Sequence, residues 1–154
     1  MPKKLNYPNF KDVLRAQHDL QGLVKKTPLM TSRILAEKTS VKRLRFKCEN
    51  FQNTGSFKFR GATNALCRLS EEGPLNVVAT HSSGNHGAAL ASAARAKGIP
   101  AHIVVPKNAP YIKKTAILSY GALVKECAPT LAAREIALKK VVTNNKASAI
   151  QPYN

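Results

Sequence analysis

The sequence has few acidic residues and few cysteines, and it contains no tryptophan. Eight Asp and Glu stand against 25 Lys and Arg, which leaves a formal net charge of +17 over 154 residues. The three cysteines are odd in number and lack the CxxC spacing of a metal pair, so they form neither a disulfide framework nor a zinc motif. We therefore expect a cytoplasmic, reducing compartment. No apolar run approaches the roughly 20 residues of a membrane span, which excludes a transmembrane protein.

The positive charge is not gathered in one basic segment. Lys and Arg run along the whole chain, with a mild excess from Lys25 to Arg60. Nucleic-acid binders usually concentrate their charge and place aromatic residues beside it, and aromatic residues are 6% of this chain. We therefore do not expect nucleic acid as a partner. An anionic ligand, or an acidic part of a larger assembly, accounts for the charge equally well.

From Asn76 onward, short β-rich runs alternate with helical segments. The predicted strands are Val77–Thr80, Ala101–Val105, Ala122–Lys125 and Ala147–Ile150. The predicted helices are Ala88–Lys97, Pro110–Ser119 and Leu131–Val142. Strands that alternate with helices in this way pair in parallel through right-handed crossovers. The pattern predicts an α/β fold with a four-stranded parallel sheet.

The first part of the chain has too few strands to close a sheet by itself. Its predicted elements are a helix capped by Asn9 and reaching Leu23, a helix over Ile34–Lys38, a strand over Leu44–Cys48 and a helix from Ser56 to Leu69. The residues Glu72-Gly73-Pro74 predict a boundary. We therefore divide the chain into residues 1–73, an incomplete large domain, and residues 74–154, a smaller βα domain.

The segment Thr80–Gly87, with the sequence THSSGNHG, lies between a predicted strand and a predicted helix. Backbone N–H groups converge at a helix N-terminus, which favours an anion there. The segment lacks the spacing of a nucleotide-binding P-loop or dinucleotide motif, so a small carboxylate or phosphate suits it better. A plain capped turn is the alternative. His81 and His86 have no metal-ligand spacing, and we expect no metal site.

Lys58 lies in the segment Asn53–Ala62, with the sequence NTGSFKFRGA, at the start of a predicted helix. A cation in the first turn of a helix opposes the helix dipole, and the flanking Phe57 and Phe59 penalise its charged form. Both effects favour a neutral amine, which is the form of lysine that attacks a carbonyl group. An ordinary exposed lysine on a basic surface is the alternative.

The two segments together resemble the fold-type-II pyridoxal-phosphate enzymes, and more narrowly the family of serine racemases and serine/threonine dehydratases. Five shorter segments also match this family: Thr27-Pro28-Leu29, Lys47-Cys48-Glu49, Gly98–Ala101, Ile103–Pro106 and Tyr120-Gly121-Ala122. The resemblance implies the three-layer fold of the tryptophan synthase β-subunit, with helices on both faces of a parallel sheet. It also implies racemisation or β-elimination of L-serine or L-threonine.

The resemblance implies a role for each matching residue. Lys58 would hold pyridoxal 5′-phosphate as a Schiff base and carry the proton on one face of the substrate Cα. Phe57 would pack beside the cofactor ring. The residues implied to bind the substrate carboxylate are Ser82, Ser83, Asn85 and His86. Ser83 would also carry the proton on the opposite face, and Asn85 would bond the cofactor's 3′-oxygen.

Relatives of this family continue past the point that corresponds to Asn154. The resemblance therefore implies that this chain is truncated, without the glycine-rich phosphate loop and without the family's divalent-metal site. We expect impaired activity of the isolated chain. The alternative is a non-catalytic remnant that binds or regulates a full-length paralogue. A homodimer, or a dimer with such a paralogue, is the expected assembly.

Overall fold

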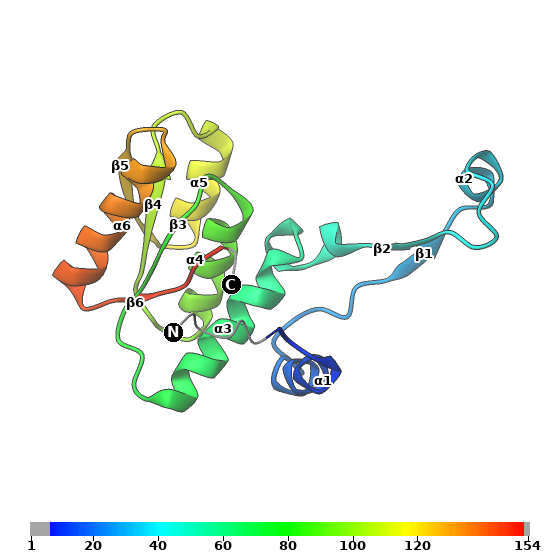
Figure 1. Cartoon of the computed structure of the whole chain (residues 1–154), viewed down its shortest axis with the longest axis horizontal. Coiled ribbons are helices and arrows are strands. Elements are labelled where there is room, and N and C mark those ends of the chain that lie inside the picture. The colour runs from blue at the N-terminus through cyan, green and yellow to red at the C-terminus, as the bar shows by residue number, and fades with distance from the viewer. Residues whose placement is uncertain (1–6, 153–154) are drawn as a thin grey trace.

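Four strands form a parallel sheet in the computed structural model of the chain, which describes residues 7–152 (Figure 1). They are β3 (Val78–His81), β4 (Ala101–Pro106), β5 (Leu123–Cys127) and β6 (Ser148–Ala149), in the spatial order β5-β4-β3-β6. Each strand pairs in parallel with its neighbour. The α/β class and the four-stranded parallel sheet are thereby confirmed.

Helices cover both faces of this sheet (Figure 1). They are α3 (Lys58–Glu72), α4 (Asn85–Ala96) and α5 (Tyr111–Ser119) on one side, and α6 (Leu131–Asn145) on the other. Successive side chains of a strand point to opposite faces. Ile103 accordingly packs in the cluster with α3, α4 and α5, whereas Val104 packs against α6. The expected three layers are therefore present.

Helix α4 lies at the centre of the larger apolar cluster. Its alanines allow close approach, and both α3 and α5 pack against it. Leu66 of α3, Leu90 of α4 and Ile117 of α5 are all fully buried there. Burial of side chains of this size typically stabilises a protein by about 1.5–3 kcal/mol each. The packing fixes the first turns of α3 and α4 relative to each other.

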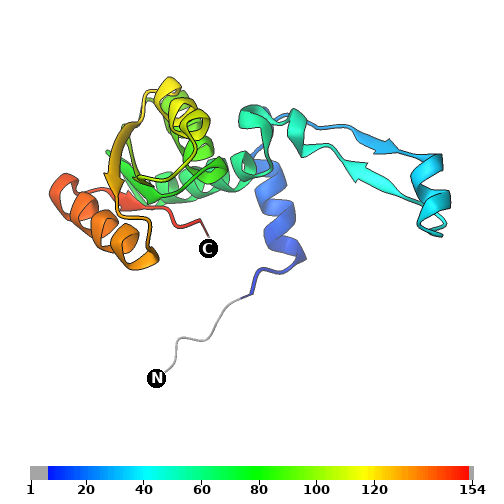
Figure 2. The ribbon, with the colours of Figure 1, turned by 90° about the horizontal axis from the view of Figure 1, so that it is seen from above.

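The N-terminal part contains α1 (Phe10–Asp19), β1 (Leu29–Thr31), α2 (Arg33–Lys38) and β2 (Arg45–Lys47). Residues 29–47 form an arm that extends away from the sheet (Figure 2). Strand β1 pairs with β2 in antiparallel fashion, a pairing that the sequence analysis missed. The predicted strand over Leu44–Cys48 corresponds to β2, whereas β1 was not predicted. All three residues of β1 are exposed, so burial gives it no alternating pattern.

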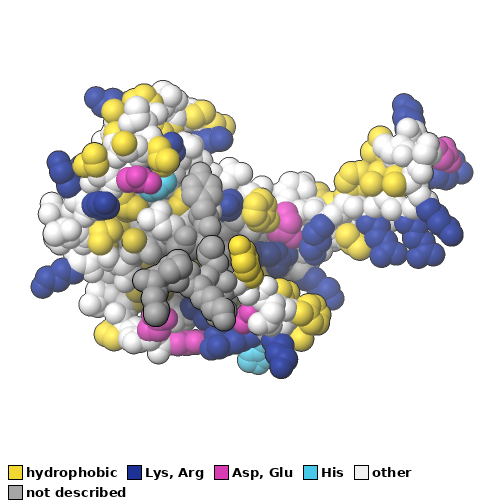
Figure 3. Space-filling model, viewed as in Figure 1, with side chains coloured by type: hydrophobic (Ala, Val, Ile, Leu, Met, Phe, Trp, Pro, Cys, Tyr) yellow, Lys and Arg dark blue, Asp and Glu magenta, His cyan; other side chains and the backbone are white. Residues whose placement is uncertain are grey.

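Basic side chains gather on the arm (Figure 3). They are Arg33, Lys38, Lys42, Arg43, Arg45 and Lys47, beside one acid, Glu37. Exposed apolar side chains accompany them, among them Met30, Ile34 and Phe46. The arm therefore adds to the net positive charge but contributes nothing to the buried core.

Several helix boundaries differ from the predicted ones. Helix α4 begins at Asn85, three residues before the predicted Ala88, because the Ser82 hydroxyl accepts the N–H of Gly87 at 2.9 Å and so satisfies a donor of the first turn. Helix α1 ends at Asp19, before the predicted Leu23. Asn9 caps α1 as predicted.

The predicted boundary near Gly73 coincides with the end of α3, where Gly73 adopts φ +155°. Helix α3 belongs to the predicted first domain, yet it packs closely on α4 of the second. The division at residues 73 and 74 stays a prediction, and residues 1–6 and 153–154 of the two proposed domains lie outside the described part.

Candidate active site

The candidate site lies at the carboxyl edge of the sheet, where β3 and β6 end and α3 and α4 begin. In a parallel α/β sheet this edge carries the loops that bind ligands. The segment after β3 brings Ser82 and Ser83 to this edge, and the first turn of α4 adds Asn85 and His86. The structure therefore brings the two sequence motifs together.

Lys58 lies in the first turn of α3, as predicted, although the helix begins at Lys58 itself and not at the predicted Ser56. Its side chain is half-buried, and its Nζ donates to the main-chain oxygen of Pro152 at 3.2 Å. The ammonium lies 5.2 Å from the centroid of the Phe57 ring, which is itself exposed. No carboxylate of residues 7–152 forms an ion pair with Lys58, so the amine is not held by a permanent counter-ion from this part of the chain.

A cavity of about 400 Å³ opens beside Lys58. Phe57, Gly61 and Ala62 of the α3 segment line one side, and His86 and Ile150 line another. Pockets of about 300–1,000 Å³ are typical of small-molecule and cofactor sites. A planar aromatic ring of cofactor size fits a cavity of this volume, and Lys58 is among the residues that line it.

Ser82 holds the loop in shape. Its buried hydroxyl accepts the N–H groups of Gly84 and Gly87 at 3.2 and 2.9 Å, and its own N–H donates to Val104 at 2.9 Å. A β-carbon on Gly87 would lie 3.0 Å from Ile103. The Ser82 O–H itself donates to the main-chain oxygen of Gly84 at 3.3 Å, so a carboxylate that accepts from this hydroxyl would have to replace that bond.

Ser83 and Asn85 are exposed at the start of α4. The backbone N–H groups of Ser83, Asn85 and His86 have no hydrogen-bond partner within residues 7–152. Free N–H groups at a helix N-terminus attract anions. The arrangement suits a carboxylate bound by main-chain donors, with the Ser83 and Asn85 side chains beside it.

His86 is almost fully buried and links α4 to the end of β6. Its Nε2 lies 3.2 Å from the main-chain oxygen of Ile150, so the neutral ring donates from this nitrogen. Burial lowers the pKa of His86 below its ordinary value of 6.5, the bond to Ile150 opposes this, and the charge of Lys58 lowers it further. The ring is therefore uncharged at neutral pH, so His86 does not offer a positive charge to a bound carboxylate.

His81, at the end of β3, is also buried. Its Nδ1 has no hydrogen-bond partner among the described residues. Burial lowers the pKa of the ring, and the positive charge of Arg134 lowers it further. The described part of the chain contains no cluster of three or more side chains suited to a metal ion.

The anchoring of α3 is a feature that the sequence analysis did not assign. Arg60 donates to both oxygens of Glu49, from Nε at 2.9 Å and from Nη2 at 2.8 Å, and Thr27 donates to the same carboxylate at 2.6 Å. The bond from Arg60 is the main cause that lowers the pKa of Glu49 to about 2. Because these residues are far apart in sequence, no spacing signals the cluster.

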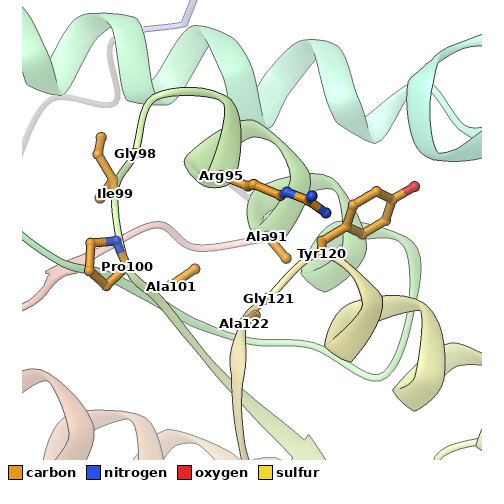
Figure 4. A pocket seen from close by; sticks show the side chains of 9 residues that line it. All are labelled: Ala91, Arg95, Gly98, Ile99, Pro100, Ala101, Tyr120, Gly121 and Ala122. Carbon is orange, nitrogen blue, oxygen red and sulfur yellow. The ribbon is translucent and has the colours of Figure 1, made fainter.

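A second cavity, of about 250 Å³, lies at the opposite edge of the sheet (Figure 4). Its lining comes from the segments before β4 and β5, and Arg95 and Tyr120 stand at its side. The Arg95 guanidinium donates to Ser119 at 3.2 Å, which holds α4 to the end of α5. This cavity contains none of the predicted site residues.

The chain belongs to the family of pyridoxal-phosphate dependent enzymes, whose sequence profile it matches over residues 20–154. This confirms the family predicted from the two motifs. The family implies pyridoxal phosphate as its cofactor. Within residues 7–152, no helix is long and apolar enough to cross a membrane.

Individual relatives agree with this assignment. The chain is 42% identical over 147 residues to the β-hydroxyaspartate dehydratase of Paracoccus denitrificans (strain Pd 1222), covering 96% of this chain and 46% of the relative. It is 46% identical over 147 residues to the human serine racemase, covering 94% of this chain and 43% of that enzyme. The structure of maize serine racemase superposes with a TM-score of 0.91 at 40% identity, and the match covers 97% of this chain and 45% of the maize chain. The chain therefore spans less than half the length of the curated relatives that it matches.

Proposed function

We propose that this chain supplies the lysine-bearing part of a pyridoxal-phosphate dependent enzyme that racemises L-serine or L-threonine or eliminates their β-hydroxyl group. The observation that carries the proposal is the Lys58 amine, placed beside a cavity of about 400 Å³ and next to the N-terminus of α4. Similarity to a serine racemase and to a dehydratase supports both reaction types.

The residues present fit the cofactor. Within residues 7–152 the Lys58 amine donates its hydrogen bond to a main-chain oxygen, so a carbonyl compound can displace that bond without breaking an ion pair. The Phe57 ring is exposed at the cavity and available to pack against a second ring. Asn85 lies on the same edge of the sheet and would bond the 3′-oxygen attached to the cofactor ring.

When bound, the cofactor would withdraw electrons from the substrate Cα and so acidify its proton. Lys58 Nζ would accept and return that proton on one face. The Ser83 hydroxyl, exposed at the start of α4, would do so on the other face. Proton return on the opposite face inverts the centre. In elimination the β-hydroxyl would instead take up a proton and leave as water, and addition of water to the dehydrated product then gives a keto acid and ammonia.

The substrate carboxylate would bind at the start of α4. The free N–H groups there and the side chains of Ser83 and Asn85 supply the donors. Ser82 would keep the loop in place through its hydroxyl, and His86 would do so through Ile150. A fixed carboxylate directs the Cα towards Lys58, which is the orientation that proton transfer needs.

The substrate class extends to amino acids with a second carboxylate. One relative at 42% identity is named for β-hydroxyaspartate, which carries a β-hydroxyl group like serine and threonine. Elimination from either kind of substrate uses the same Lys58 chemistry. The side-chain group would then be selected by residues around the loop rather than by Lys58.

The proposal also covers how firmly the chain retains the cofactor and whether it assembles as a dimer. None of the residues assigned above binds the cofactor phosphate, so we expect the isolated chain to release the cofactor on dialysis and to react slowly. We also propose assembly as a dimer, with a second copy or with a longer paralogue. Co-purification with such a paralogue, in the absence of any proton exchange, would favour the non-catalytic alternative.

Exchange of the substrate Cα proton tests the proposed function. The purified chain is incubated in D2O with excess pyridoxal phosphate and L-serine, and deuteration at Cα is followed by NMR. We expect exchange above the rate of the free cofactor, and its loss to that rate in Lys58→Ala. Lys139→Ala, on the exposed surface of α6, is the matched control and keeps the exchange. Equal rates in the native chain and Lys58→Ala would contradict the proposal.

A further inference from the structure

Lys113 reaches from α5 to the candidate carboxylate site. It lies in the first turn of α5, and its side chain crosses the backbone of Gly84 at the start of α4. A β-carbon placed on Gly84 would lie 3.0 Å from Lys113 Cδ and 3.1 Å from Lys113 Nζ. The absence of a side chain at Gly84 therefore makes room for the lysine, whose ammonium stands beside the residues proposed to bind a carboxylate.

The position is electrostatically unfavourable for a cation on its own. The N-terminal end of a helix carries a partial positive charge, and Lys113 stands near this end of both α4 and α5. No acidic side chain within residues 7–152 pairs with it. The neighbouring Lys114, in contrast, is held by Glu126 at 2.6 Å and by the main-chain oxygen of Lys107 at 2.8 Å. An anion beside Lys113 would relieve the repulsion.

Helix α4 packs between the elements that carry the two lysines. Lys58 begins α3 and Lys113 belongs to α5, and both helices contact α4 (Figure 1). An amino acid whose α-carboxylate is bound at the start of α4 would have its amino group on the Lys58 side. Its side chain can then extend towards α5.

We propose that Lys113 binds the side-chain carboxylate of a dicarboxylic amino acid of the aspartate class at this site. The inference rests on the proposed function, because it takes the start of α4 as the place of the α-carboxylate. It adds a specificity-determining residue that the two motifs do not contain. A neutral side chain, such as that of asparagine, would leave the Lys113 ammonium without a partner.

Binding of L-aspartate and L-asparagine to the purified chain tests this directly, without cofactor or turnover. The two ligands have nearly the same shape and differ by one charge. In 15N NMR titrations at physiological salt, we expect the amide signals of Gly84 and Asn85 to move with both. Aspartate should bind about two- to five-fold more tightly, the effect of one exposed ion pair.

Two variants separate the ammonium's position from its charge. Lys113→Gln removes the charge and should abolish the preference for aspartate. Gly84→Ala keeps the charge but displaces the flexible lysine, so it should reduce the preference as well. Lys97→Gln, at the opposite end of α4, lowers the net charge equally and should leave the preference unchanged.

Three results would overturn the inference. They are an equal affinity for the two ligands, a preference that survives in Lys113→Gln, and no movement of the Gly84 and Asn85 signals with either ligand. Equal weakening of both ligands in Lys113→Gln would instead assign the lysine to the α-carboxylate, which also contradicts the proposal. The proposed function is tested separately by Lys58→Ala, so either can fail while the other stands.

Discussion

Replacing Glu49 by Gln breaks the ion pair that holds the first turn of α3 against the base of the arm. Arg60 bonds both carboxylate oxygens, at 2.8 and 2.9 Å, and lies two residues after Lys58. Gln can accept one of these bonds but carries no charge. The change therefore tests the electrostatic part of the anchor while it keeps the size of the side chain.

The lowered pKa of Glu49 determines how much stability we expect Glu49→Gln to lose. A fall from 4.5 to about 2 corresponds to roughly 3 kcal/mol of preference for the charged carboxylate in the folded chain. The side chains of Arg60 and Glu49 are 31% and 18% exposed, so solvent screening reduces this, and we expect Glu49→Gln to cost about 1–3 kcal/mol at pH 7. A lowered carboxyl pKa contributes stability above pH 4.5, and the contribution is lost as the pH falls from 4.5 towards 2.

Urea unfolding of the native chain and Glu49→Gln, at pH 7 and at about pH 3, measures the effect. The difference in the free energy of unfolding should shrink by more than half at the lower pH. Glu37→Gln is the control, because its pair with Arg33 is 68–89% exposed and should contribute less than about 0.5 kcal/mol. A difference that is the same at both pH values would refute the reasoning.

Two further predictions concern α4 and its surroundings. Gly87→Ala should destabilise the fold by about 1–3 kcal/mol in urea unfolding, because the new methyl group meets Ile103 at 3.0 Å in the core. In Gly61→Ala, in α3, the new methyl group meets nothing within 4 Å, so this control should stabilise the fold by up to about 1 kcal/mol. Equal effects of the two changes would be inconsistent with the packing. An NMR pH titration of His86 should give a pKa below 6.5, and since the unfolded chain then binds the proton more readily, stability should decrease as the pH falls below 6.5. A His86 pKa at or above 6.5 would show that the ring is not buried as described.

The sequence was sufficient for the elements whose signals are local. The strand Val77–Thr80 and the end of the next helix near Lys97 could be predicted, because the strand pattern, the helix pattern and the helix-breaking Gly98 and Pro100 lie within a few residues. The start of α4 was placed too late, since it depends on a hydroxyl, that of Ser82, five residues away in sequence from the N–H of Gly87 that it accepts. Local propensity does not report such a cap.

Other features depend on contacts between distant residues. The Glu49–Arg60 pair joins the base of the arm to α3, and Lys113 meets Gly84 across 29 positions of sequence. Without the fold, each of these side chains is one of many charged residues in a basic chain. Lys58 could be singled out only because the residues around it match a family motif.

Selective attachment of the cofactor at Lys58 tests the central claim most directly. The native chain is mixed with limiting pyridoxal phosphate, reduced with borohydride, digested, and mapped by mass spectrometry. We predict that Lys58 carries most of the label and that Lys139, on the far helix α6, carries little. Label spread over the exposed lysines in proportion to their accessibility, with no preference for Lys58, would contradict the account.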